Sequence, residues 1–153
     1  MEEVCEEVAR FLQGVFEGSK LRLDTTLEES EDNCRLNVDG ADVDLLVSQG
    51  GELLDALQHL LNQIFSQKLS KGQRIVCDAQ SFRATREAEL RAMAHHAAGR
   101  VRVTGVPFTF GPMSANERRI IHLELADERD LNTESVGEGL ARKLRVSLRD
   151  AGR

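Results

Sequence analysis

The spacing of apolar residues switches along this chain between a helical period and a strand period, and the order of these switches limits the possible folds. Helical spacing predicts an amphipathic helix over residues 2–17. Alternating residues then predict two strands, over residues 21–27 and 34–38. An apolar helix over residues 53–65 and a buried strand over residues 74–78 follow. The first half is therefore predicted to run helix, strand, strand, helix, strand.

The second half repeats this mixture of elements. A long helix is expected from Ser81 to Gly105, followed by a short strand at Phe108 and Phe110. Two further strands are expected over residues 132–136 and 140–148, after a helix that begins near Ser114. We therefore predict an α+β protein of two small domains, with residues 1–79 in the first and residues 80–153 in the second.

Composition excludes several classes of protein. The chain has 153 residues, 41% of them hydrophobic and 30% charged, as in an ordinary globular protein. No apolar run approaches the roughly 18 residues needed to span a bilayer. Its three cysteines are far apart and show neither disulfide nor zinc spacing, which favours free thiols and a cytoplasmic location. We also find no catalytic arrangement, and we expect a non-enzymatic protein without cofactor or metal.

Charge is divided unevenly along the chain. Residues 1–65 hold 15 acidic residues against 4 Lys and Arg, whereas residues 66–153 hold the other 11 acidic residues against 16 Lys and Arg. The first segment would repel a polyanion and the second would attract one.

A single stretch, residues 111–122, combines a helix start with a chemical site. Ser114 is a natural N-cap, and Glu117 follows at the spacing at which its carboxylate completes a capping box. Arg118 and His122 then lie four residues apart on one helical face, with Arg119 beside them. These side chains suit a phosphate group. The alternative is that Arg118 pairs with a nearby carboxylate and His122 is a core histidine.

The final strand adds further cations. Its alternation predicts one apolar face with Leu140, Leu144, Val146 and Leu148, and one basic face with Lys143 and Arg145. If this strand packs beside the helix of residues 111–122, six residues converge on nucleic acid: Arg118, Arg119, His122, Arg142, Lys143 and Arg145. About four neutralised phosphates would give a slope near −3 in log affinity against log salt.

Several of these motifs resemble the bacterial Jag family, also called KhpB or EloR. The resemblance covers roughly residues 20–148 and rests on four segments: Asp55 to Asn62, Asp78 with Phe82, Arg83, Arg86 and Leu90, Pro112 to His122, and Thr133 to Glu138. It implies a type II KH domain followed by an Arg-x-x-x-His domain that contacts single-stranded nucleic acid, with the family's further N-terminal domain expected to be absent. Family members are cytoplasmic RNA-binding regulators linked to cell elongation and division. They often work with a small single-domain KH protein, and the family name records association with a membrane insertase.

Two departures from the family pattern affect the expected function. The KH loop, normally Gly-x-x-Gly with a basic residue, reads Ser48-Gln49-Gly50-Gly51 and is followed by Glu52. Asn116 also stands where the family usually has an aromatic residue that could stack on a base.

The leading hypothesis is therefore a regulatory protein that binds single-stranded RNA, or single-stranded DNA, mainly through its C-terminal domain. The KH half would serve as a rigid partner or a dimer surface. The alternative hypothesis is a protein-interaction adaptor that retains little affinity for nucleic acid.

Overall fold

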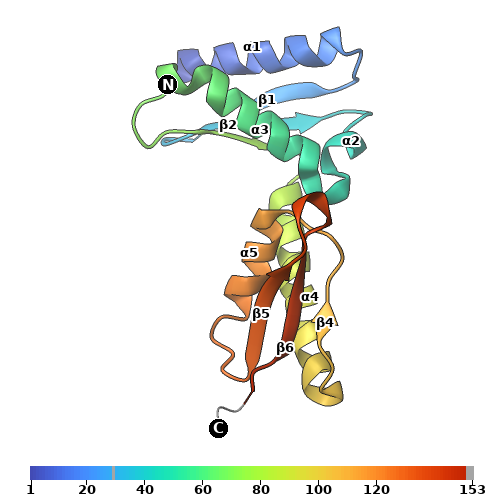
Figure 1. Cartoon of the computed structure of the whole chain (residues 1–153). Coiled ribbons are helices and arrows are strands. Elements are labelled where there is room, and N and C mark those ends of the chain that lie inside the picture. Colours follow the sequence, from blue (N-terminus) through green and yellow to red (C-terminus); the bar gives the residue numbers. More distant parts are fainter. Residues whose placement is uncertain (29, 151–153) are drawn as a thin grey trace. The chain divides into compact units, whose positions relative to one another are not determined.

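Figure 1 shows a computed structural model of the protein, which describes residues 1–28 and 30–150. The chain forms two compact units, Met1–Arg83 and Ala84–Arg153, which we call unit 1 and unit 2. Each unit combines helices with a three-stranded sheet, so the predicted α+β class is confirmed. The structural division falls four residues after the boundary expected from the sequence.

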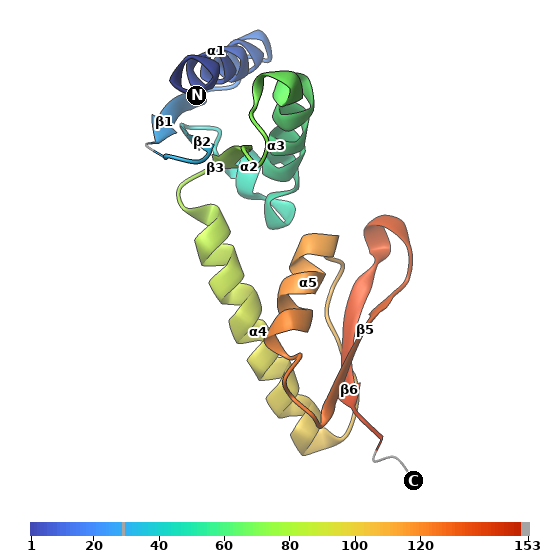
Figure 2. The ribbon, with the colours of Figure 1, turned by 90° about the vertical axis from the view of Figure 1, so that its left-hand side faces the viewer.

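Unit 1 consists of a small mixed sheet and three helices. In chain order its elements are α1 (Glu2–Gly18), β1 (Asp24–Glu28), β2 (Cys34–Asp39), α2 (Asp44–Val47), α3 (Glu52–Phe65) and β3 (Ile75–Asp78). The strand order is β1-β2-β3, with β1 antiparallel and β3 parallel to β2. Helices α1 and α3 cover one face of this sheet (Figures 1 and 2).

The core of unit 1 follows from the periodicity of its elements. Helix α1 buries Val8, Leu12 and Phe16, which recur every three to four residues, against Leu36 and Val38 of β2. The strand predicted over residues 21–27 is displaced by a few residues, because the chain becomes extended and paired only from Asp24 onward.

Unit 2 contains most of the long helix and an antiparallel sheet. Its elements are α4 (Phe82–Thr104), which starts two residues before the unit, β4 (Phe108–Thr109), α5 (Ala115–Glu124), β5 (Leu131–Val136) and β6 (Lys143–Leu148). The strand order is β4-β6-β5. Small buried residues of α4, such as Ala94 and Ala97, allow close packing against Ile121 of α5 and Val146 of β6. Figure 2 shows α4 and α5 side by side.

The last strand differs from its predicted extent. A short 3-10 turn occupies Gly139–Ala141, and β6 begins at Lys143 rather than at Leu140. Gly137 and Gly139 have positive φ angles of 86° and 56°, which turn the chain before it becomes extended. Leu140 therefore does not join the apolar face of the strand and is 90% exposed, so that part of the prediction is wrong.

The three cysteines are free, as the sequence predicts, and they are buried. Burial raises the pKa of the Cys77 thiol to about 12, and burial together with Cys5 raises that of Cys34 further. Such thiols stay protonated and chemically inert.

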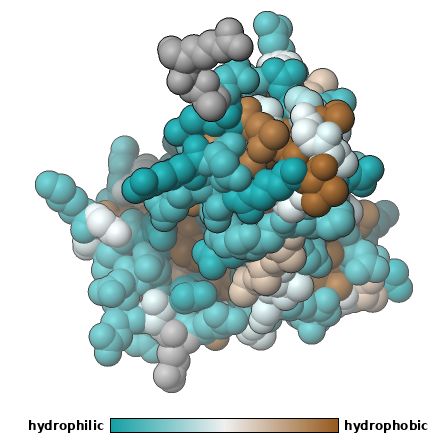
Figure 3. All heavy atoms as spheres, turned by 90° about the horizontal axis from the view of Figure 1, so that it is seen from below, coloured by the Kyte–Doolittle hydropathy of each residue, from teal (hydrophilic) through white to brown (hydrophobic). Residues whose placement is uncertain are grey.

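The surface of the protein is mostly polar. In the view of Figure 3, hydrophilic residues predominate and hydrophobic ones gather in small patches. Such scattered apolar exposure is normal for a globular domain. Across residues 1–28 and 30–150, no helix is both long and apolar enough to cross a membrane.

Candidate nucleic-acid interface

Helix α5 begins as the sequence predicts, with Ser114 as its N-cap. Ser114 has extended backbone angles, and its Oγ accepts a hydrogen bond of 3.2 Å from the amide of Glu117. The first half of the capping box is thus confirmed.

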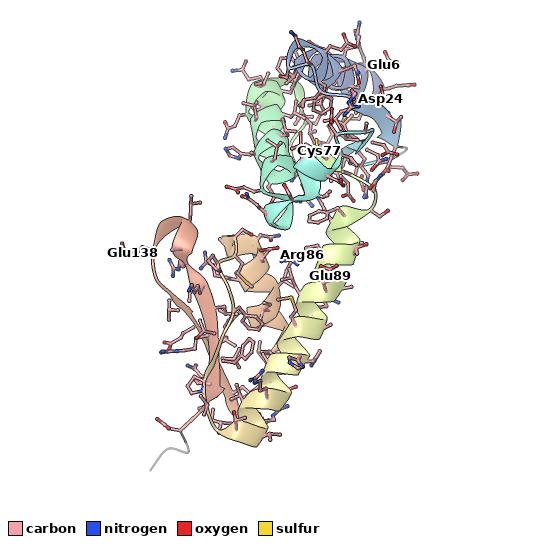
Figure 4. All side chains as sticks on the ribbon, turned by 90° about the vertical axis from the view of Figure 1, so that its right-hand side faces the viewer. Glu6, Asp24, Cys77, Arg86, Glu89 and Glu138 are labelled. Carbon is pink, nitrogen blue, oxygen red and sulfur yellow. The ribbon has the colours of Figure 1, made fainter. Side chains whose placement is uncertain are left out.

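The second half of the capping box is wrong. The Glu117 side chain is buried, with only 6% of the residue exposed, and accepts a bond of 2.7 Å from Nε of Arg86 on α4. Arg86 also pairs with Glu89 at 3.2 Å, and Figure 4 shows both residues on α4. A charged donor in the interior stabilises a buried carboxylate more than an exposed backbone amide does. The pair fixes α5 against α4, so that the neighbouring Arg118 points toward the sheet.

Arg118 and His122 both bind hydroxyl groups of β5. Nη1 of Arg118 donates to Oγ of Ser135 at 2.8 Å, and its Nε donates to the carbonyl of Met113 at 3.3 Å. Nδ1 of His122 pairs with Oγ1 of Thr133. All of these partners are neutral, so the guanidinium is oriented without being neutralised. Two of its five N–H donors are used, which leaves three for a ligand.

These residues line a hollow of about 310 Å³ between α5 and the sheet. Its walls are Ala115, Arg118, Arg119, His122, Thr133, Ser135 and Leu144. None of these lining residues is acidic, and they present guanidinium, imidazole and hydroxyl groups together. We call this feature the cationic hollow. Donors of this kind around an open space suit a phosphate oxygen.

The structure separates the six predicted site residues into two groups. Arg118, Arg119 and His122 lie together in the cationic hollow. Arg142 is exposed just before β6, and its carbonyl accepts a bond from the amide of Met113, beside the start of α5.

Lys143 and Arg145 lie on the other face of the sheet. Leu144 and Val146 are buried on the face toward α5, and strand alternation turns the residues between them outward. Arg145 also pairs with Glu134, its direct partner in the register of β5 and β6. The expected convergence of Lys143 and Arg145 with the α5 residues is therefore wrong in geometry.

Ion pairing concentrates the free positive charge of unit 2. The unit holds 12 bases and 10 acids, and four of its bases (Arg86, Arg91, Arg102 and Arg145) have carboxylate partners. Within the described chain, no carboxylate lies within 4.0 Å of the guanidinium nitrogens of Arg118, Arg119 or Arg142. The alternative of a carboxylate-paired Arg118 and a core His122 does not describe this structure, since His122 is exposed.

The loop Ser48-Gln49-Gly50-Gly51 lies between α2 and α3 in unit 1. The Ser48 hydroxyl donates to the carbonyl of Leu45 at 3.2 Å, so it turns back onto its own chain. Gly51 has a φ of 79°, and a Cβ there would lie 2.4 Å from Cε1 of Phe82. Gly51 is thus required for packing, while the loop itself offers no cation.

Two residues of the cationic hollow were missing from the sequence-based site. Thr133 and Ser135 orient His122 and Arg118, and they face α5 because they pair with Val146 and Leu144 of β6. Their alternation along the predicted strand was the available signal.

A helix that presents Arg118 and His122 over a three-stranded antiparallel sheet defines a class of protein, because the family model of the Arg-x-x-x-His domain matches residues 88–148. Curated relatives extend the similarity to nearly the whole chain. RNA-binding protein KhpB of Clostridium symbiosum is 30% identical over 154 residues, covering 99% of this chain and 69% of its own length. The chain belongs to the KhpB family.

Two further relatives carry the same name. RNA-binding protein KhpB of Bacillus subtilis (strain 168) is 28% identical over 93% of this chain and 69% of its own length. RNA-binding protein KhpB of Lactiplantibacillus plantarum (strain ATCC BAA-793 / NCIMB 8826 / WCFS1) is 32% identical over 74% of this chain and 35% of its own length.

Proposed function

We propose that this protein is a non-enzymatic regulator that binds single-stranded RNA, with the phosphates held in the cationic hollow. The observation that carries the proposal is the Arg118 guanidinium, which neutral acceptors hold in place and which keeps free donors beside Arg119 and His122. The names of the three relatives and the match to the Arg-x-x-x-His domain support it. Arg142, beside the start of α5, extends the positive surface.

Unit 1 is proposed to be a type II KH-like domain that contributes little to RNA binding. Its order of helix, strand, strand, two helices and strand supports this, as does the position of the loop at residues 48–51 between α2 and α3. In KH domains this loop clamps the nucleic-acid backbone. Here the loop has no cation, and the exposed acids Asp44 and Glu52 flank it, so a phosphate chain would be repelled.

A second role for unit 1, protein binding, is favoured by exposed apolar residues. Leu53, Leu60 and Ile64 of α3 are 41%, 47% and 48% exposed, and Leu45 of α2 is 51% exposed. Together with Leu57 the α3 residues are spaced four, three and four positions apart, as in a helix that packs on another helix. We propose that this stripe contacts a small single-domain KH protein or a second copy of the chain. A cytoplasmic location, a role in cell elongation and division, and association with a membrane insertase rest on the family resemblance alone.

A titration of fluorescently labelled single-stranded RNA tests the main proposal. Arg118→Ala removes a charge inside the cationic hollow, whereas Lys143→Ala removes the same charge on the other face of the sheet. We expect Arg118→Ala to weaken binding about tenfold or more, because charge-assisted hydrogen bonds contribute about 1.5–3 kcal/mol. Lys143→Ala should change the affinity by less than about threefold. Equal effects, or no micromolar binding at low salt, would favour the adaptor hypothesis instead.

A further inference from the structure

The two edges of the sheet in unit 1 are treated differently. Along β3, side chains occupy the outer edge. Asn62 accepts from the Ile75 amide at 2.9 Å and donates to the Ile75 carbonyl at 2.7 Å. Gln58 accepts from the Cys77 amide at 3.0 Å, and Arg83 donates to the Cys77 carbonyl at 2.7 Å. Side chains that bond an edge in this way prevent another strand from adding to it.

The edge of β1 is closed only at its beginning. Gln13 of α1 accepts from the Thr25 amide at 3.1 Å and donates to the Leu23 carbonyl at 3.2 Å. In an antiparallel pair, residues with outward-pointing peptide groups alternate with inward-pointing ones. The amide and carbonyl of Leu27 therefore also point outward. No hydrogen bond outside the β1–β2 ladder reaches either group within the described residues.

A groove between α1 and β1 follows this open edge. One hollow of about 420 Å³ is lined by Glu6, Ala9 and Arg10 of α1 together with Thr25 and Leu27. A second hollow of about 660 Å³ shares Leu27 and continues along Glu2 and Cys5 of α1. Leu27 is 43% exposed, which gives the groove an apolar contact beside its free peptide groups.

The groove is acidic. Its described lining includes four carboxylates, from Glu2, Glu6, Glu28 and Glu31, against one cationic side chain, Arg10. Glu28 is partly compensated by Arg35 at 3.6 Å. Figure 4 shows Glu6 on α1 near Asp24 on β1, which adds a further acid at this side of the unit. This charge disfavours RNA, and it disfavours a second copy of β1, which would bring Glu28 and its acidic neighbours against their own kind.

We propose that the open edge of β1 binds an extended basic segment of a partner protein, which adds to the sheet as a fourth strand. Its backbone pairs with the amide and carbonyl of Leu27, as in other cases of strand addition. Alternate side chains of the segment are basic and face Glu2, Glu6 and Glu28 across the groove. This site is separate from the cationic hollow and does not depend on RNA binding.

The test uses the full chain and a labelled peptide of about eight residues that alternates Lys and Val, long enough to form one strand. Amide hydrogen exchange followed by NMR reports the edge directly. In the free protein the outward amide of Leu27 should exchange rapidly, whereas the inward amide of Thr26 is protected by β2. Peptide should slow exchange at Leu27 about tenfold or more and leave Thr26 unchanged.

Matched probes separate strand addition from simple charge attraction. A peptide alternating Glu and Val should not bind. Lys-Val peptide that is N-methylated on the residues facing β1 should lose at least about tenfold in affinity, because its donors are removed. Glu6→Gln should weaken binding several-fold, whereas Glu52→Gln on α3 should leave it unchanged.

Three outcomes would overturn the proposal. The N-methylated peptide could bind as well as the parent, Leu27 could stay unprotected while peptide binds elsewhere, or no Lys-Val binding could be detected. Protection of Leu27 that rises with protein concentration in the absence of peptide would also overturn it, since it would assign the edge to a second copy.

Discussion

At the scale of single residues, Glu117 and Arg118 are neighbours with opposite roles. Glu117 is buried and neutralised by Arg86, whereas Arg118 is held by Ser135 and Met113 and keeps its charge. The position of the second depends on the first, because both side chains leave the same turn of α5. A structural ion pair thus aims a functional cation.

Removing that ion pair should loosen unit 2. Glu117→Gln leaves Arg86 with only its more exposed partner Glu89, whose side chain is 57% exposed. We expect a loss of about 1–3 kcal/mol in the free energy of unfolding, since the pair is mostly but not wholly buried. Urea unfolding followed by NMR signals of unit 2 measures this loss. Glu138→Gln, on an exposed turn, is the control, and an equal change in both variants would show that the pair is not structural.

Cys77 makes a prediction about pH. Because its pKa is about 12 in the folded chain and near 9 when unfolded, the folded state binds more protons above pH 9. Its stabilising contribution is present below pH 9 and is lost as the pH rises toward 12, by at most about 1.4 kcal/mol per pH unit. Cys77→Ala should flatten the fall in unit 1 stability between pH 9 and about 10.5. A slope identical to that of the parent protein would rule out this contribution.

At the scale of elements, two glycines of unit 1 should respond in opposite directions to the same substitution. Gly51→Ala forces a side chain onto a φ of 79° and against Phe82, so we expect a loss of more than about 1 kcal/mol. Gly14→Ala lies within α1 with nothing within 4 Å of the new Cβ, so we expect a gain of about 0.5–1 kcal/mol. Denaturant midpoints of the two variants compare them, and a stabilised Gly51→Ala would contradict the described loop.

The elements themselves follow from the sequence more readily than their contacts do. Periodicity and capping signals predicted α1, α3, α4 and the Ser114 cap of α5, because these depend on neighbouring residues. The partner of Glu117 lies 31 residues away on α4, and no local pattern indicates it. Alternation placed Lys143 and Arg145 on one face of β6, but it did not reveal that α5 packs on the other face. The hydroxyl partners of Arg118 and His122 were missed for the same reason, because they depend on the register of β5 and β6.

At the scale of the whole molecule, charge assigns different partners to the two units. Unit 1 carries 16 acids and 8 bases, and unit 2 carries 10 acids and 12 bases. The small excess in unit 2 becomes effective because four of its other cations are paired with carboxylates, whereas those at the cationic hollow are not. Unit 1, with its acidic groove and apolar α3 stripe, is suited to protein contacts.

This distribution changes the expected salt dependence of RNA binding. With Lys143 and Arg145 on the other face, we count two to three phosphates at Arg118, Arg119 and Arg142 rather than four. The slope of log affinity against log salt should then be about −1.4 to −2.1, not −3. Titrations at several salt concentrations measure it, and a slope of about −3 or steeper would mean that further cations bind the chain.

The most direct test of the central claim is to map single-stranded RNA on the isotopically labelled protein by NMR. The account predicts that RNA shifts the side-chain Nε–H of Arg118 and the amides of Arg119, Thr133 and Ser135, while the loop at residues 48–51 is unaffected. Shifts concentrated in that loop and α3, with the cationic hollow unchanged, would contradict it.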